Sequence, residues 1–499
     1  MNVEFEGFLR VEDNMLYWNM LLQPKRVREN TTVEKTSNDN RSPFKKDFDT
    51  VCNSTILRRL QDKAQVFPLE QEDYARTRLT HSIEVLSIAE SLGMQAINVI
   101  KKHDPKYISN NGDVCPYIDE LPNILKTVAL LHDMGNPPFG HLGEQIIGDW
   151  FNNNLGKLAI NSDGRLVFKD GSDAKDTLAY KLKGVYSKDL IHFEGNAQLL
   201  RLVSKLNLVV DENGMNLSYP VLASFIKYPT DSESINKDIL IKKKVGYFTA
   251  EKQLFDDIQK TLGLNGYRHP IAYLLEAADD IAYLTADIED AHHKGLISVG
   301  KIKAYLESKR GDRIIDKVLE QMDIYEKKAE TMEYTDDIDG YIVHRARVLI
   351  KGLMIDAVYS SYDDNYDDIM NQRFEGELLD KSSASEIVKV LRKIEQENIY
   401  YSNQILDNKT RAYAVITKLL ETYVPAAINW SEQDCGKDTA ENLLYLSLSK
   451  NYRYICELAN KKSKSEEEKI YNKLLLVTDQ VSGMTDTHAL TVYKKITAT

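Results

Sequence analysis

The stretch from residue 130 to residue 144 forces the chain to change direction between two helices. It reads Leu-Leu-His-Asp-Met-Gly-Asn-Pro-Pro-Phe-Gly-His-Leu-Gly-Glu. Upstream of it, Pro122 suits the first turn of a helix, and the apolar residues that follow recur at helical spacing, which predicts a buried helix over 122–133. Gly135 ends that helix. The two prolines then restrict the backbone, so the 135–140 loop is held stiffly before a new helix begins.

This change of direction brings together side chains that bind metals and transfer protons. His132 and Asp133 arrive at the end of the buried helix, whereas His141 and Glu144 lie one turn apart at the start of the next. A histidine next to an aspartate is equally compatible with a core histidine beside a helix-end carboxylate. The assignment therefore depends on what the rest of the chain adds.

A second predicted helix opens at Arg76-Thr-Arg-Leu-Thr-His-Ser. His81 and the apolar residues after it line one face as far as Gly93, where we expect the helix to end. His81 therefore faces the core. In isolation, such a residue is more often a hydrogen-bonded core histidine than a metal ligand.

A long helix is predicted to begin near Pro270, with a stripe of small and apolar residues on one side. Asp279, Tyr283 and Asp287 recur every four residues beside that stripe, so they share one face. The segment 276–289 contains five carboxylates within a well-packed pattern. A carboxylate near an apolar surface needs a partner, and a cation is the simplest one.

Two imidazoles and two carboxylates on three predicted helices are enough to hold one octahedral divalent cation and leave positions open. The candidate ligands are His81, His132, Asp133 and Asp279. Imidazole with carboxylate suits Mn, Fe, Ni, Co or Zn, while Mg prefers more oxygen ligands. Lys227 and Tyr228, and the three lysines at 242–244, fit either a solvated surface or a phosphate pocket.

Composition limits the class of protein. The 499 residues are 42% hydrophobic and 28% charged, as in a globular chain with a large core, and the formal charge of −12 opposes nonspecific nucleic-acid binding. No apolar run reaches the length of a membrane span and the N-terminus lacks a signal-peptide pattern, so we expect a cytoplasmic protein with no membrane association. Residues 1–50 are polar and predict an extended arm, and the sequence around 161–171 predicts a small surface hairpin.

Several segments together resemble the dGTPase family of HD-domain metal phosphohydrolases, in its long enterobacterial form. They are Arg58-Arg-Leu-Gln-Asp-Lys-Ala-Gln-Val-Phe-Pro, Arg76-Thr-Arg-Leu-Thr-His-Ser, His132-Asp-Met-Gly-Asn-Pro-Pro-Phe-Gly-His, His192-Phe-Glu-Gly-Asn-Ala-Gln, Glu276-Ala-Ala-Asp-Asp-Ile-Ala-Tyr and Ser482-Gly-Met-Thr-Asp. The stretches 155–190 and 310–475 carry no matching motif. The resemblance implies an all-α fold with a small β-hairpin insertion, an HD core over 51–305 and a helical C-terminal region over 306–499.

The resemblance also implies an activity: hydrolysis of dGTP to deoxyguanosine and intact triphosphate, with one divalent metal ion per subunit, most often Mg²⁺ or Mn²⁺. It implies a homohexamer, with single-stranded DNA as a possible effector. Carried over by position, the metal ligands are His81, His132, Asp133 and Asp279, and the catalytic residues are His141, Glu144 and His192. The substrate-binding positions are Gln65 for guanine, Asn196, Lys227, Lys244 and Tyr283 for the triphosphate and sugar, and Asp287 for the sugar 3′-hydroxyl. Arg78, one turn before His81, is an additional phosphate candidate, and Tyr228 beside Lys227 is a further substrate-binding candidate.

Three questions stay open at the level of sequence. Val245 stands where the related pattern has proline, so the register that selects Lys244 among three adjacent lysines is not fixed. His141 suits protonation of the leaving 5′-oxygen and activation of water equally well. The alternatives to a dGTPase are a broader dNTP triphosphohydrolase, an HD enzyme acting on a signalling nucleotide, and a silent nucleotide or single-strand nucleic-acid binder; the intact ligand set argues against the last.

Overall fold

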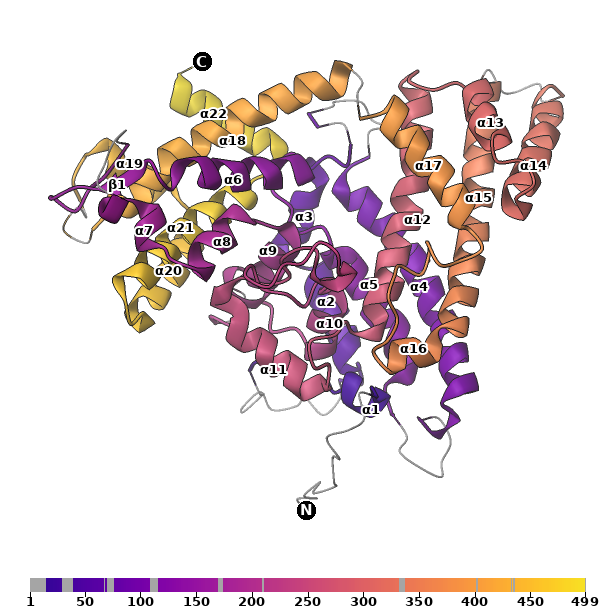
Figure 1. Ribbon diagram of the computed structural model, residues 1–499, viewed down its shortest axis with the longest axis horizontal. Helices are drawn as coiled ribbons and strands as arrows, with labels where there is room; N and C mark the ends of the chain where they lie inside the picture. The colour runs from indigo at the N-terminus through magenta and orange to yellow at the C-terminus, as the bar shows by residue number, and fades with distance from the viewer. Residues whose placement is uncertain are drawn as a thin grey trace.

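The computed structural model describes residues 15–28, 39–66, 68–69, 76–107, 115–168, 174–208, 211–331, 337–400, 403–431, 433 and 436–498. Within these residues the fold is helical apart from one two-stranded sheet, which confirms the predicted fold class (Figure 1). The α-helices and strands in chain order are α1 (Trp18–Leu21), α2 (Pro43–Cys52), α3 (Thr55–Arg59), α4 (Arg78–His103), α5 (Leu121–Leu131), α6 (Gly140–Asn154), β1 (Leu158–Ile160), β2 (Leu166–Phe168), α7 (Leu178–Lys181), α8 (Val185–Ile191), α9 (Gly195–Arg201), α10 (Tyr219–Phe225), α11 (Lys252–Leu262), α12 (Pro270–His293), α13 (Val299–Glu307), α14 (Arg313–Ala329), α15 (Ile338–Asp364), α16 (Tyr366–Met370), α17 (Ser385–Asn398), α18 (Asn403–Asn429), α19 (Ala440–Ser447), α20 (Lys450–Lys462), α21 (Glu466–Ser482) and α22 (Asp486–Thr497).

Three helices at the centre of the molecule, α4, α5 and α12, pack against one another and carry the predicted metal ligands. Thr77 and Thr80 form a capping box that begins α4. The helix continues through Gly93 to His103, so the predicted end at Gly93 is wrong. Gly93 has a packing role instead: a Cβ there would lie 3.0 Å from the Cα of Pro122, so the absence of a side chain lets α5 approach closely.

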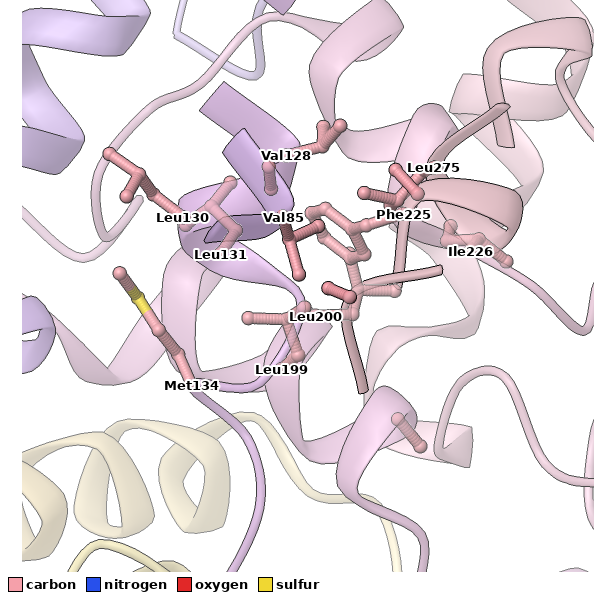
Figure 2. Close-up of a cluster of buried hydrophobic side chains, with 14 of the residues drawn as sticks. Val85, Val128, Leu130, Leu131, Met134, Leu199, Leu200, Phe225, Ile226 and Leu275 are labelled. Carbon is pink, nitrogen blue, oxygen red and sulfur yellow. The ribbon is translucent and has the colours of Figure 1, made fainter. Parts of the chain in front are cut away.

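The core beneath these helices is apolar and continuous. Figure 2 shows Val85 of α4 beside Val128 and Leu131 of α5, with Leu199 of α9 and Phe225 of α10 closing the cluster, all buried. By length and composition α4 is the one helix in the described part of the chain that could cross a membrane. Its apolar face is buried in this cluster, as expected for a core helix.

The expected extended arm over residues 1–50 is wrong for the residues that the structure describes. Trp18 and Leu21 of α1 are fully buried, and the Trp18 indole nitrogen donates a hydrogen bond of 2.8 Å to the Tyr366 hydroxyl. Residues 43–52 form α2, whose Asp47 pairs with Arg26. The segment is polar on average, but a few large apolar residues, such as Trp18 and Leu21, pack into the core. Residues 1–14 and 29–38 lie outside the described part.

Two further expectations concern the small hairpin and the division of the chain into regions. The predicted hairpin is confirmed, with β1 and β2 antiparallel and Ala159 opposite Val167. The helices from α13 onward form two groups (Figure 1). In the first group, α13, α14, α15 and α17, the helices α15 and α17 contact α12; in the second, α18 to α22, the helix α18 contacts α6. The division into a core over 51–305 and a C-terminal region over 306–499 remains a prediction.

Candidate active site

A cavity of about 620 Å³ lies where α4, the α5–α6 loop, α9, α12 and the start of α18 meet. Polar and charged side chains line much of it. Most of the substrate and metal positions proposed from the sequence are among the lining residues: Gln65, Arg78, His132, Asp133, His141, Asn196, Lys227, Tyr228, Lys244, Asp279, Tyr283 and Asp287. Its volume falls in the range of small-molecule sites, which is about 300 to 1,000 Å³.

One end of the cavity holds the predicted metal-ligand cluster. His81, His132 and Asp279 offer ligand atoms that all lie within 4.8 Å of one another. Nε2 of His81 is 3.1 Å from Oδ1 of Asp279, and Nε2 of His132 is 3.4 Å from the same oxygen. The three residues come from α4, the end of α5 and α12, as the sequence predicted.

The chemistry of these donor atoms fits a divalent cation. Nδ1 of His132 lies 2.7 Å from the carbonyl oxygen of Ala129, which can only accept, so Nδ1 carries a proton and Nε2 is the ring nitrogen that can bind a metal once it has lost its own proton. That Nε2 is buried and has no hydrogen-bond partner. Burial alone would lower the pKa of His132, but the charges of Asp133 and Asp279 outweigh burial and raise it to about 9. A cation would replace this proton as the partner of the two carboxylates.

Asp133 lies beside the cluster, and its carboxylate is held from two sides. Arg78 donates to Oδ2 at 2.6 Å, and the side-chain amide of Asn136 donates to Oδ1 at 2.6 Å. Oδ2 is also 3.5 Å from Nε2 of His132. Burial opposes ionisation of Asp133, but the positive charge of Arg78 lowers its pKa well below the usual range. Asp133 is therefore an ionised oxygen donor next to the three clustered ligands.

Two glycines allow the loop after α5 to approach its neighbours. Gly195 begins α9, and a Cβ there would lie 2.3 Å from the side-chain oxygen of Asn136 and 2.5 Å from Oε1 of Glu144. Gly140 begins α6 with a φ of +60°, and a Cβ there would lie 2.3 Å from a guanidinium nitrogen of Arg78. Any side chain at either position would displace residues that line or support the site.

His141 and Glu144 form the predicted pair. Nδ1 of His141 lies 2.8 Å from Oε2 of Glu144, whose other oxygen accepts from the backbone N–H of Gly195 at 2.9 Å. The negative charge of Glu144 raises the pKa of His141. Glu144 is buried and His141 is exposed at the cavity, so the carboxylate orients an imidazole that can reach a ligand.

Two lysines of the cavity, Lys227 and Lys244, are already held by carboxylates. Nζ of Lys227 is 3.1 Å from Oδ2 of Asp279, and Nζ of Lys244 is 3.1 Å from Oε1 of Glu194. The amide of Asn196 donates to the same Glu194 oxygen at 3.1 Å. Of the three lysines at 242–244, only Lys244 lines the cavity.

Polar atoms without partners mark other parts of the lining. Oδ1 of Asp287 is buried and has no hydrogen-bond partner, and burial together with Asp290 raises the pKa of Asp287 to about 8. Tyr283 lies one turn before it on α12. The side-chain oxygen of Gln65 is likewise buried without a partner. A ligand that donates hydrogen bonds would satisfy both oxygens.

Three of the predicted site residues do not line the cavity. His81 and Glu144 lie one step back from the cavity surface. His81 contacts Asp279, which lines the cavity, and Glu144 accepts a hydrogen bond from His141, which also lines it. His192 is different: it follows the last residue of α8, its side chain is exposed, and the charged residues that influence it are Lys188 and Lys237. The structure therefore does not bring His192 together with the other candidates.

The whole sequence is similar to those of known proteins. A family model described as HD domain matches residues 78–175. A deoxyguanosinetriphosphate triphosphohydrolase-like protein of Listeria innocua is 38% identical over 96% of this chain and 99% of its own length. The chain belongs to the dGTPase family. A deoxyguanosinetriphosphate triphosphohydrolase-like protein of Synechocystis is 30% identical over 96% of the chain and 98% of its own length, and the deoxyguanosinetriphosphate triphosphohydrolase of Yersinia enterocolitica is 29% identical over 91% and 94%.

Some lining and supporting residues of this dGTPase-family protein were not found from its sequence. Glu194 stands inside a motif that was recognised, next to Gly195 and Asn196, so its buried carboxylate could have been proposed. Burial and the neighbouring Glu144 raise its pKa to about 7. By contrast, no local pattern marks the wall formed by Tyr400, Ile405, Asn408 and Lys409, which lies in the stretch without motifs.

Proposed function

We propose that this protein hydrolyses dGTP to deoxyguanosine and inorganic triphosphate. The observation that carries the proposal is that one cavity brings together groups suited to each part of a nucleoside triphosphate. A cluster of metal ligands and a set of cations share it with Tyr283 and the unpartnered carboxyl of Asp287. A nucleoside triphosphate offers matching groups: a polyanion to the metal and cations, and a hydroxyl to the carboxyl.

The residues that would hold one divalent metal ion are His81, His132 and Asp279, with Asp133 as the fourth ligand. We expect Mg²⁺ or Mn²⁺, with Co²⁺, Ni²⁺, Fe²⁺ or Zn²⁺ also compatible with nitrogen and oxygen donors. When bound, the ion neutralises phosphate charge and makes a water more acidic. Arg78 holds Asp133 in place at 2.6 Å, so it supports the metal end as well as offering charge to a phosphate.

The remaining phosphates would be held by Lys227, Lys244 and Asn196. In the structure these groups are bound to Asp279 and Glu194, at 3.1 Å in each case. A triphosphate would compete with these carboxylates for the same hydrogen atoms. Because the cations are already oriented toward the cavity, little reorganisation is needed when the polyanion arrives.

His141 would transfer the proton on which the departure of the 5′-oxygen depends. An alkoxide is a poor leaving group, so the reaction needs a proton at that oxygen. Glu144 accepts from Nδ1 of His141 at 2.8 Å and favours the protonated imidazole, which supports the role of general acid. Nε2 would then carry the proton that is donated.

Sugar and base recognition would fall to Asp287, Tyr283 and Gln65. Asp287 is the acceptor for the 3′-hydroxyl, and the ring of Tyr283 would pack against C2′ and leave no room for a 2′-hydroxyl. A site built to pair with a hydroxyl rejects a ligand lacking it by a factor of about 10⁴. The amide of Gln65 would pair with the guanine edge.

One experiment tests the proposal directly. The purified protein is incubated with each of the four dNTPs and with GTP, in Mg²⁺ or Mn²⁺, and nucleoside, monophosphate, pyrophosphate and triphosphate are separated. We expect deoxyguanosine and triphosphate in equal amounts. Formation of dGMP and pyrophosphate would overturn the assignment, whereas comparable turnover of all four dNTPs would favour the broader dNTP triphosphohydrolase.

The cellular setting is proposed on the same basis. We infer a cytoplasmic enzyme of deoxynucleotide pool control that assembles as a homohexamer and responds to single-stranded DNA. Exposed apolar side chains support self-association, among them Leu443 of α19 and Tyr454 of α20. The formal charge of −12 opposes nucleic acid as the main ligand of the chain.

A further inference from the structure

The segment between α21 and α22 has no role in the chemistry described so far, although its sequence Ser482-Gly-Met-Thr-Asp was recognised as a motif. It lies against the loop that carries the metal ligands and against the segment that carries Gln65. Asp486 at its end is 2% exposed, and Lys63, which it faces, is also 2% exposed. Neither side chain lines the 620 Å³ cavity.

Asp486 joins two backbone segments through its carboxylate. Oδ2 accepts from the N–H of Ala64 at 2.9 Å, and Oδ1 accepts from the N–H of Phe139 at 2.9 Å. Phe139 has a φ of 64°, an uncommon left-handed conformation for a residue with a side chain, and it immediately precedes α6. The bond to Asp486 helps to keep this turn in place, and the turn places His141.

Lys63 joins the same segments with the opposite charge. Its ammonium donates to the carbonyl oxygen of Asn136 and, at 3.0 Å, to that of Ser482. The carbonyl of Lys63 in turn accepts from the N–H of Arg78 at 2.8 Å. Asn136 and Arg78 are the two residues that hold Asp133, so the ammonium lies one contact away from a metal-site carboxylate.

We propose that Lys63 and Asp486 are positioning residues that fix the base-recognition segment and the metal-binding loop relative to one another. The inference rests on the proposed function for the role of Gln65. Without the Lys63 ammonium two backbone carbonyls lose their donor, and an amide nitrogen in place of one Asp486 oxygen leaves one backbone N–H without its acceptor. In either case the segments then shift. A displacement of about 1 Å at a site of this kind can lower a rate by about 100-fold.

The test uses two variants and a matched control. D486N keeps the shape of the side chain but presents an amide to two N–H groups, and K63M keeps the length of the side chain but removes its donors. The control is D62N. Asp62 accepts from the Thr487 hydroxyl at 2.6 Å, so it joins the same two segments at the surface. We measure Mn²⁺ affinity by calorimetry, kcat and KM for dGTP and dATP, and thermal unfolding.

We expect D486N and K63M to weaken Mn²⁺ binding by about 10-fold to 100-fold and to reduce the preference for dGTP over dATP, whereas D62N changes neither. In the Q65A background, D486N should lower kcat with no further loss of base preference, because the two residues act on that preference through one contact.

Wild-type Mn²⁺ affinity and base preference in folded D486N would overturn the proposal. If D486N does not fold, K63M decides by the same measurements. If the unmodified protein does not release triphosphate, the proposed function fails, but the Mn²⁺ comparison still tests Lys63 and Asp486.

Discussion

Replacing Asp287 by asparagine should stabilise the protein while it damages the site. Asp287 is 4% exposed and one of its oxygens has no partner. Burial, followed by the charge of Asp290, raises its pKa from 3.8 to about 8. The folded protein therefore retains a proton that the unfolded chain releases. Stability falls as the pH rises from about 4 to about 8, and the neutral amide of D287N abolishes this loss.

The size of the effect follows from the same pKa. Each pH unit inside that range corresponds to about 1.4 kcal/mol, so the advantage of D287N should grow by about 4 kcal/mol between pH 5 and pH 8. An unfolding entropy of about 2 cal/mol/K per residue converts this to a rise of about 4 °C in the difference between the two melting temperatures.

Thermal unfolding of both proteins at several pH values, without metal or nucleotide, measures that difference. The control is D364N on α15, where the aspartate is exposed and no growing difference is expected. Activity is measured in parallel. An amide at 287 cannot lose a proton to become a carboxylate when the 3′-hydroxyl binds, so D287N should raise KM for dGTP. A melting difference that stays constant or shrinks toward pH 8 would refute the assignment of a buried, protonated carboxyl.

Three further predictions concern the metal, the sugar and the base. H132A should lose Mn²⁺ binding and turnover while the fold persists, as checked by calorimetry and circular dichroism; substantial activity after EDTA treatment without added metal would contradict this. Y283A should lose rate and much of the preference for dGTP over GTP, and equal turnover of the two by the unmodified enzyme would show that Tyr283 has another role. Q65A should weaken the preference for guanine, measured as the ratio of kcat/KM for dGTP and dATP, and an unchanged ratio would exclude the proposed base contact.

Much of the centre of the molecule could be predicted from the sequence because its signals are local. Pro122 and Pro270 mark helix starts through their own backbone chemistry, and the spacing of Asp279 and Asp287 places both on one face. Gly93 shows the limit of this reasoning. A glycine often ends a helix, but Gly93 lies inside α4, where it makes room for α5. The sequence around Gly93 does not show that another helix packs there.

The contacts that sequence reasoning missed join distant parts of the chain. Trp18 binds Tyr366, which is 348 residues away, and Asp486 binds Ala64 across 422 residues. No periodicity relates such pairs. His192 illustrates a related limit: its motif was recognised, but its side chain is exposed and does not line the cavity. Residues identified by motif alone still require the fold to show which of them reach the cavity.

The cavity wall formed by Tyr400, Ile405, Asn408 and Lys409 bears on how such enzymes diversify. The metal ligands and His141 come from α4, α5, α6 and α12, whereas Tyr400, Ile405 and Asn408 come from a stretch in which no motif was found. Substitutions there change the shape offered to a ligand without altering the reacting groups. Exchanging this short segment between relatives could therefore change substrate specificity, in evolution or by engineering, while the metal ligands and His141 stay the same.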